Sequence, residues 1–182
     1  MNRDIQKFKN DLESCLNQTK LEQLSILMLH VKLKNLSEFY KLSYEVLTKN
    51  ILETLTFKNP KNIIVPAFTY SFTKNKIFDL ELSKSEVGVF SEIFRLKYSN
   101  YRTNDAIFSF CHLKNFEKEY KNINFKAAFI KSSIWEYFYK KNITIVNIGL
   151  DHLVISLIHY IEYICKVPYR KLFKIKGQVS LA

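Results

Sequence analysis

His159 and Glu162 form the pair of residues in this sequence whose types and spacing point most directly to chemistry. Residues three apart on a helix share a face, so the Glu162 carboxylate can orient or charge-stabilise the His159 imidazole. A histidine held in this way is a candidate general base. Ordinary surface pairs have the same spacing, and spacing alone leaves both interpretations open. The expected helix follows a strand ended by Gly149, and ligands gather at the carboxyl ends of strands in α/β sheets, which favours the catalytic interpretation.

Other polar residues give weaker signals. His30 ends the first expected strand and is a second candidate for a ligand site at a strand end. Residues 101–105 are a polar cluster that can donate to phosphate or a carbonyl, or a plain polar turn. Glu92 and Arg95 have the spacing of a weak surface ion pair. Nucleotide-binding, zinc-protease and hydrolase signatures are absent, and we expect no metal.

Alternating elements have to position these residues. Apolar runs bounded by polar residues predict strands at residues 24–31, 62–68, 106–110, 127–130 and 143–148. Apolar residues at helical spacing predict helices at residues 1–22, 44–55, 85–95, 133–139 and 153–165. The N-terminal helix is amphipathic and highly charged. The pattern predicts an α/β fold, a single-domain mixed α/β sandwich with helices on both faces of a central sheet.

Composition limits the class of protein. The chain has 182 residues and a formal net charge of +11, which favours anionic partners. Most of this charge is lysine scattered along the chain, so a solvated surface is favoured over a nucleic-acid-binding face. No apolar run is long enough to cross a membrane and no signal peptide is visible, so we expect a cytoplasmic protein. The three cysteines are isolated among apolar residues, which predicts buried free thiols.

Four segments match one family in type and order. Residues 65–70 form a strand ending in proline and then Phe-Thr. Residues 85–95 match Ser-x-x-Gly-x-x-(Ser/Thr)-Glu-x-Phe-Arg, and residues 102–109 match an Arg-(Ser/Thr) turn before a Ser-containing strand. Residues 149–170 match a strand end, a hydroxyl residue, a His-x-x-Glu helix and Pro-Tyr-Arg. Together they resemble the aminoglycoside 3-N-acetyltransferase family, which implies one acetyltransferase-like domain over residues 1–182.

The resemblance implies transfer of an acetyl group from acetyl-CoA to a primary amine of an aminosugar. His159 would take the proton from the amine while Glu162 holds the imidazole. The implied residues around the coenzyme are Thr69, Arg102, Thr103 and Ser109. The implied residues around the aminosugar are Tyr70, Glu92 and Ser156.

Departures from the family pattern concern the acceptor and turnover. Asp105-Ala106 replaces a usual His-Pro, and Val31-Lys32 replaces two serines after His30. Leu153 stands where the family has an acidic residue, and relatives continue well beyond the Pro-Tyr-Arg segment. With the positive charge, these departures favour a nucleotide-linked aminosugar of polysaccharide biosynthesis over a polycationic antibiotic. The alternative is a truncated or degenerate relative without turnover that acts as a binding or structural partner.

Overall fold

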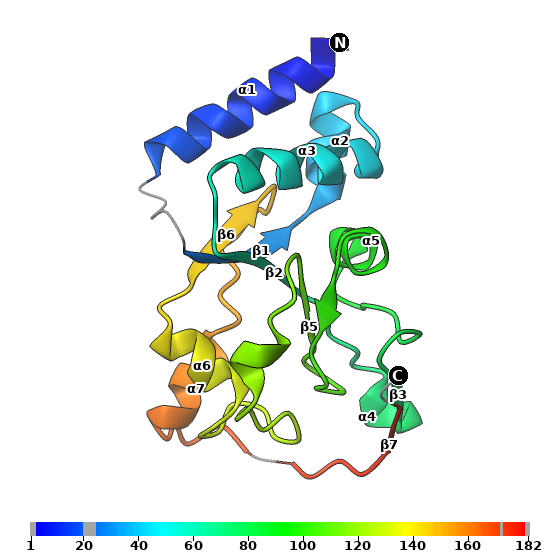
Figure 1. Cartoon of the computed structure of the whole chain (residues 1–182), viewed down its shortest axis with the longest axis vertical. Helices are drawn as coiled ribbons and strands as arrows, with labels where there is room; N and C mark the ends of the chain where they lie inside the picture. Colours follow the sequence, from blue (N-terminus) through cyan, green and yellow to red (C-terminus); the bar gives the residue numbers. More distant parts are fainter. Residues whose placement is uncertain (1–2, 20–24, 172, 181–182) are drawn as a thin grey trace.

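The computed structural model describes residues 3–19, 25–171 and 173–180. Five strands form the central sheet in the order β4-β5-β2-β1-β6 (Figure 1). These are β4 (Tyr101–Arg102), β5 (Phe110–His112), β2 (Asn62–Pro66), β1 (Ile26–Val31) and β6 (Thr144–Ile148). Strand β1 is parallel to both of its neighbours, whereas β5 is antiparallel to β2 and β4 is antiparallel to β5. The sheet is therefore mixed.

Strand β1 lies inside the sheet and has both faces covered. Leu27 and Leu29 belong to one apolar core, whereas Ile26 and Met28 belong to the other. Successive side chains of a strand point to opposite faces, so a strand buried on both sides needs a continuous apolar run. This requirement explains why β1 was recognisable in the sequence.

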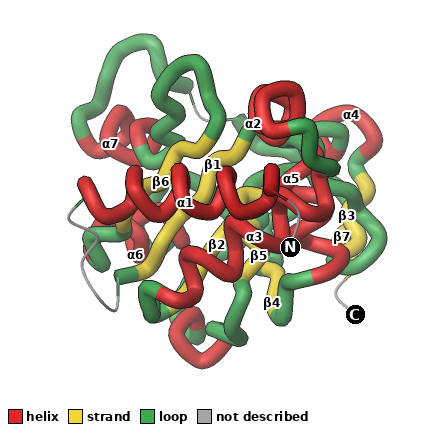
Figure 2. Tube along the Cα trace, turned by 90° about the horizontal axis from the view of Figure 1, so that it is seen from above, coloured by secondary structure: helices red, strands yellow, loops and turns green. Residues whose placement is uncertain are grey.

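Four helices cover the first face of the sheet. They are α1 (Arg3–Gln18), α2 (Leu33–Tyr40), α3 (Tyr44–Phe57) and α5 (Val89–Lys97). Helix α1 buries Phe8, Leu12 and Leu16, which repeat every four residues, and it packs on α3 and α2. Seen from above, α1 runs across β1 and β6 (Figure 2).

Aromatic side chains dominate the second face. Helices α6 (Ile134–Lys140) and α7 (Ile158–Ile164) and the 3₁₀ turn η1 (Glu117–Tyr120) cover it. Trp135 is fully buried, with edge contacts to Phe110 at 5.1 Å and to Phe108 at 6.3 Å between ring centroids. To one side of the sheet, α4 (Phe72–Asn75) precedes a small parallel pair, β3 (Ile77–Asp79) with β7 (Gln178–Ser180).

His112 is a buried histidine in this aromatic layer. Its side chain is fully buried, and neither ring nitrogen has a hydrogen-bond partner among the described residues. The ring stacks on Phe116 and meets Tyr120 edge-on. Burial lowers the pKa of His112 to about 3, so the imidazole is neutral in the folded chain.

We expect this histidine to make the fold acid-sensitive. Between about pH 6.5 and the folded pKa of about 3, the unfolded chain binds a proton at His112 that the folded chain does not. The free energy of unfolding therefore falls as the pH drops through this range, by at most about 1.4 kcal/mol per pH unit. His112→Phe keeps the ring and removes the titration. Urea unfolding at about pH 7 and pH 5 measures the difference, and equal pH dependence in both proteins would contradict it.

The predicted fold class is confirmed, including helices on both faces of the sheet. Strands β1, β2 and β6 and helices α3 and α6 lie where the sequence predicted them, and Ser133 caps α6. The N-terminal helix ends at Gln18 instead of residue 22, and residues 20–24 lie outside the described part of the chain. Helix α2 had not been predicted.

Four other predictions were wrong in position. The predicted strand at 106–110 begins only at Phe110, because the Asp105 carboxylate accepts the N–H groups of Ile107 and Phe108 and makes a turn. Residues 127–130 are turns, with Phe129 at φ 58°. The helix predicted from residue 85 starts at Val89 after Gly88, whose φ is 120°. The last predicted helix starts at Ile158, five residues later than expected.

The cysteines follow the prediction only in part. Cys111 is buried, and burial raises the pKa of its thiol to about 11. Cys15 and Cys165 are exposed. Cys15 precedes the buried Leu16 on the amphipathic helix α1 and lies off its inner stripe, which spacing alone did not resolve. Among the described helices, none is long and apolar enough to cross a membrane.

Candidate active site

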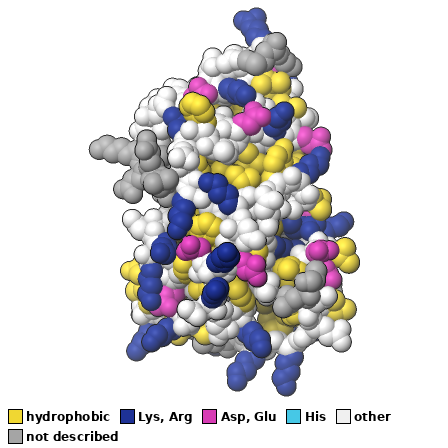
Figure 3. Space-filling view, viewed as in Figure 1, with side chains coloured by type: hydrophobic (Ala, Val, Ile, Leu, Met, Phe, Trp, Pro, Cys, Tyr) yellow, Lys and Arg dark blue, Asp and Glu magenta, His cyan; other side chains and the backbone are white. Residues whose placement is uncertain are grey.

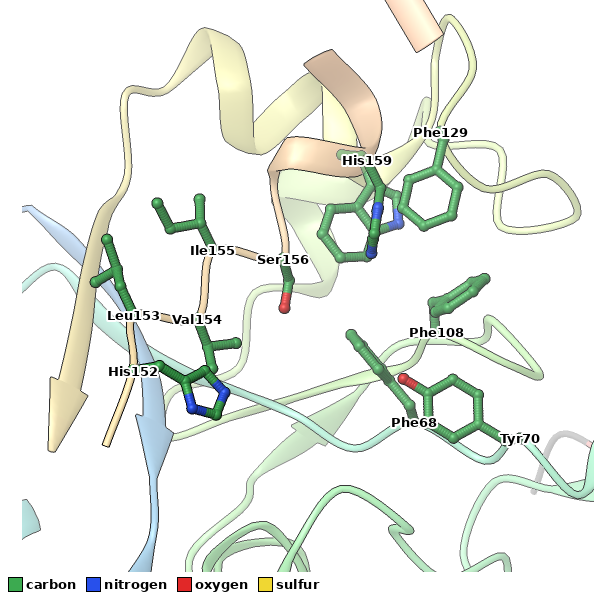
Figure 4. A pocket seen from close by; sticks show the side chains of 11 residues that line it. Phe68, Tyr70, Phe108, Phe129, His152, Leu153, Val154, Ile155, Ser156 and His159 are labelled. Atoms are coloured by element: carbon green, nitrogen blue, oxygen red, sulfur yellow. The ribbon is translucent and has the colours of Figure 1, made fainter. Parts of the chain in front are cut away.

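A cavity of about 360 Å³ opens on the aromatic face of the sheet (Figure 4). It is lined by Phe68, Tyr70, Phe108, Phe129, Trp135, His152, Leu153, Val154, Ile155, Ser156 and His159. The ring of His159 and the hydroxyl of Ser156 point into the same space, opposite Phe68 and Tyr70 (Figure 4). Aromatic rings thus form one wall, and the segment between β6 and α7 forms the other.

Side-chain hydrogen bonds hold the segment between β6 and α7 in place. The Asn147 side chain donates to Val154 O at 3.1 Å and accepts from Val154 N at 3.0 Å. Asn35, at the start of α2, donates to Gly149 O and to Asp151 Oδ1, both at 2.9 Å. The bond to Val154 O occupies a carbonyl that a helix starting at residue 153 would have used, which explains the late start of α7.

Gly149 turns the chain at the end of β6. Its φ is 69°, and an added Cβ would lie 2.8 Å from both Lys32 O and Leu36 Cγ. We expect Gly149→Ala to reduce the free energy of unfolding by ~1–3 kcal/mol, because the left-handed backbone and the close carbonyl both resist a side chain. Urea unfolding measures the loss. Gly88→Ala is the matched control, since its φ is also positive but nothing lies within 4 Å of its Cβ position; an equal loss in both variants would assign the effect to the backbone alone.

The His159–Glu162 pair exists as predicted and has additional partners. His159 Nδ1 lies 3.2 Å from Glu162 Oε2, and the His159 side chain is 48% exposed. Tyr169 donates its hydroxyl to Glu162 Oε1 at 3.1 Å, and Arg170 Nε donates to Glu162 Oε2 at 3.0 Å. Hydrogen bonding with Arg170 and then with His159 lowers the pKa of the Glu162 carboxyl to about 2, so it is ionised. The other ring nitrogen of His159, Nε2, has no protein partner among the described residues.

Ser156 and His30 meet at the cavity. Ser156 Oγ lies 3.4 Å from His30 Nε2, so the two candidates from distant parts of the chain come together. Burial lowers the pKa of His30 to about 4, and the ring is neutral near pH 7. A neutral imidazole behind Ser156 can orient its hydroxyl toward a ligand.

The four residues predicted around the coenzyme form a buried cluster. Arg102 donates from Nε to Ser109 Oγ, from Nη1 to Leu80 O and Ser83 O, and from Nη2 to Ala67 O and Thr69 Oγ1. All five N–H groups of the guanidinium are therefore used inside the protein. Thr103 Oγ1 accepts from Phe110 N at 2.9 Å. The structure brings Arg102, Thr69 and Ser109 together but gives each of them internal partners.

The residues predicted around the aminosugar are separated. Tyr70 lines the cavity and is 46% exposed, and Ser156 lines the same cavity. Glu92 lies elsewhere, where it forms a two-pronged ion pair with Arg95 at 2.9 and 2.8 Å and accepts from Ser85 N at 2.8 Å. Glu92 is thus not a lining residue of the cavity.

Sequence reasoning missed the aromatic wall and its support. Phe108 reaches the cavity because Asp105 makes the turn before it, and burial raises the pKa of Asp105 to about 6. Phe129 reaches it from a turn, and Trp135 from α6, where its Nε1 has no partner among the described residues. Isolated aromatic residues in three segments have no common spacing, so no sequence signal could have joined them. Asn147 was detectable only as a polar residue in a β-branched strand.

The residues that line the cavity offer no negative charge to a cationic ligand. None of the cavity-lining residues is a carboxylate. On the face seen in Figure 3, lysine and arginine side chains are spread from top to bottom among apolar and acidic groups. Leu153, at the position where the resemblance implies an acidic residue, lines the cavity and is 70% exposed. In the described part of the chain there is also no group of three or more His, Cys, Asp or Glu residues placed to hold a metal ion.

Fold and site define an α/β protein with a histidine–carboxylate pair at an aromatic cavity. A family model described as aminoglycoside 3-N-acetyltransferase matches residues 28–181. The chain belongs to the aminoglycoside 3-N-acetyltransferase family. A comparison with curated proteins gave no match.

Solved structures share the fold at low sequence identity. The YokD protein from Bacillus subtilis is 14% identical with a TM-score of 0.69, covering 90% of this chain and 72% of YokD. AAC-IIIb, solved with CoASH, is 13% identical with a TM-score of 0.68, covering 85% of this chain and 64% of that protein. AAC-VIa, solved with sisomicin, is 16% identical with a TM-score of 0.65, also covering 85% and 64%. The chain thus spans 72% of the length of YokD and less than two thirds, 64%, of AAC-IIIb and AAC-VIa.

Proposed function

We propose that this protein transfers an acetyl group from acetyl-CoA to the primary amine of an aminosugar. The observation that carries the proposal is the position of His159. Its ring points into the aromatic cavity, its Nδ1 lies beside the ionised Glu162, and its Nε2 has no protein partner in the described chain (Figure 4). Family membership supports this activity, and the solved relative with CoASH supports the coenzyme.

The residues support a direct transfer. The amine nitrogen attacks the thioester carbonyl carbon, forming the C–N bond, and His159 Nε2 takes a proton from that nitrogen. The C–S bond then breaks, and coenzyme A leaves as a thiolate that receives this proton from His159, which returns the imidazole to its neutral form. Glu162 stabilises the imidazolium that forms, because its charge lies beside Nδ1. Ser156, held by His30, is placed to donate to the ligand in the same cavity.

The coenzyme is an anion, and the protein carries a net charge of +11, which favours their encounter. Direct contact between Arg102 and a coenzyme phosphate requires one of its internal hydrogen bonds to break. Thr69 and Ser109 are held in the same cluster. We therefore propose that these residues and Thr103 serve the coenzyme indirectly, by stabilising the strand ends beside the cavity.

The acceptor we propose is a neutral or anionic aminosugar, such as one linked to a nucleotide. Rings of Phe68, Tyr70 and Phe108 can stack on the apolar face of a sugar or on a base, and no carboxylate in the cavity lining is available to hold a polycation. The solved relative AAC-VIa binds sisomicin, so the aminoglycoside class is the matching comparison in any acceptor test.

A thermal-shift titration of the full chain with acetyl-CoA tests the coenzyme part first. Saturation at ~100 times the dissociation constant adds about 2.7 kcal/mol, which raises Tm by several degrees. Free thiol release with a panel of aminosugars then tests turnover. A folded chain without a shift would support the second interpretation, a family member without turnover that acts as a binding partner.

Leu153→Asp tests the acceptor part of the proposal. A new carboxylate at the cavity should improve binding of a cationic aminoglycoside about fivefold, the equivalent of ~1 kcal/mol. Leu82→Asp makes the same change at a leucine that is 78% exposed and outside the cavity lining, and should not improve it. Calorimetric titration compares the two. Tight binding of the aminoglycoside to the unmodified chain would contradict the proposed acceptor.

A further inference from the structure

Two side chains with opposite hydrogen-bonding roles, one acceptor and one donor, lie within hydrogen-bond distance of His159 Nδ1. Nδ1 lies 3.2 Å from Glu162 Oε2 and 2.5 Å from Arg170 Nη2. An ionised carboxylate only accepts hydrogen bonds, and a guanidinium only donates them. Nδ1 of a neutral imidazole either carries a proton or has a lone pair, so it can bond to one of these partners at a time.

Arg170 is placed by contacts other than the one with His159. Its Nε lies 3.0 Å from Glu162 Oε2, and its Nη2 donates to the same oxygen. On its other side, the guanidinium carbon lies 5.2 Å from the centroid of Phe129, a cation–π geometry. The Phe129 ring in turn meets the His159 ring edge-on at 5.5 Å. Arg170 is thus clamped between a carboxylate and an aromatic ring, with Nη2 beside the histidine.

We propose that Arg170 is a positioning residue that decides which nitrogen of His159 carries the proton. While Arg170 Nη2 donates to Nδ1, the proton is on Nε2, and the ring offers an N–H group to the cavity. When the guanidinium bonds to Glu162 alone, Nδ1 carries the proton and donates to Glu162. Nε2 then offers a lone pair, which is the form that can accept a proton from an amine.

This inference rests on the proposed function, because only in acetyl transfer is His159 the base. It adds a control step to that function. Of the two contacts with Nδ1, the one with Arg170 Nη2 is the shorter, at 2.5 Å against 3.2 Å for Glu162 Oε2, and on this geometry we expect the Nε2–H tautomer in the chain without ligands. A movement of the guanidinium that breaks its hydrogen bond to Nδ1 converts His159 to the form that can act as the base.

Tyr169 provides a matched control. Its hydroxyl donates to Glu162 Oε1 at 3.1 Å, so it stabilises the same carboxylate as Arg170. Among the described contacts it has none with the His159 ring. Tyr169→Phe therefore removes a partner of Glu162 without changing the donor at Nδ1.

The test is long-range ¹H–¹⁵N correlation NMR of the histidine side chains at about pH 8, where a free imidazole is neutral. The full chain is used without coenzyme or acceptor, and the His159 signals are assigned by their loss in His159→Ala. We expect the Nε2–H tautomer in the unmodified chain and in Tyr169→Phe, and the Nδ1–H tautomer in Arg170→Met. The Nδ1–H tautomer in the unmodified chain, or no change in Arg170→Met, would overturn the proposal.

The measurement separates this inference from the proposed function. It needs no substrate, so a chain that fails to bind acetyl-CoA can still show the tautomer change. Conversely, an active chain whose tautomer does not depend on Arg170 would leave acetyl transfer standing and remove Arg170 from it. A change of the same size in Tyr169→Phe would show that loss of any Glu162 partner is sufficient, and would also overturn the role of Arg170.

Discussion

His159→Ala is expected to lower the rate of acetyl transfer about 100-fold or more, because a positioned base contributes roughly 10²–10⁴-fold. The loss should appear in kcat with a small change in KM, since the imidazole acts on the amine proton during transfer and adds little to ground-state binding. Steady-state release of the coenzyme A thiol measures both constants.

Two controls make this expectation specific. The acetyl-CoA thermal shift of His159→Ala should match that of the unmodified chain, which shows that the cavity is intact. Glu162→Gln should lose less than His159→Ala, because the carboxylate acts on the substrate only through the ring. An unchanged rate in His159→Ala would mean that another group removes the proton. The histidines to consider then are His152, which lines the cavity, and His30, which lies beside Ser156.

Arg102→Met is expected to reduce the free energy of unfolding by about 3 kcal/mol or more, because buried acceptors lose a charged donor. Arg102 is 7% exposed, and its guanidinium joins the strand end at Ala67 to the loop at Leu80 and Ser83. Burial lowers the pKa of Arg102, yet the group still keeps five internal acceptors. Urea unfolding at neutral pH measures the loss.

Ser109→Ala is the matched control for Arg102. It removes one acceptor of the guanidinium and one donor to Ala67 O, and should lose only about 1 kcal/mol. If Arg102→Met and Ser109→Ala lose the same free energy of unfolding, the guanidinium does not stabilise the fold as expected. A weaker acetyl-CoA shift in such a stable variant would then assign Arg102 to the coenzyme phosphates directly.

Sequence-based predictions were reliable for features that depend only on residues close together in the chain. The apolar run of β1 is needed for a strand buried on both faces, and four of the five residues of β6 are β-branched. The His159–Glu162 contact was predictable because residues three apart on a helix are always neighbours. Ser133 caps its helix by a bond within three residues.

Predictions failed where a distant or neighbouring side chain competes for the backbone. Asp105 takes the N–H groups of residues 107 and 108 and turns a predicted strand into a loop. Asn147 bonds to Val154 across the end of β6 and delays α7. Glu92, predicted at the aminosugar, instead pairs with Arg95, three residues further along α5, and accepts the N–H of Ser85 from the preceding loop.

The sequence by itself therefore determined the mixed α/β class, the family and the pair of groups suited to proton transfer, since each depends on short-range periodicity or on residue order. Only the tertiary structure decided what surrounds that pair. It placed Arg102 in a closed cluster, brought His30 to Ser156, and set Arg170 against His159. The physical reason is that hydrogen-bond donors are satisfied by whichever acceptors the packed chain brings near, and residue spacing along the chain does not contain that information.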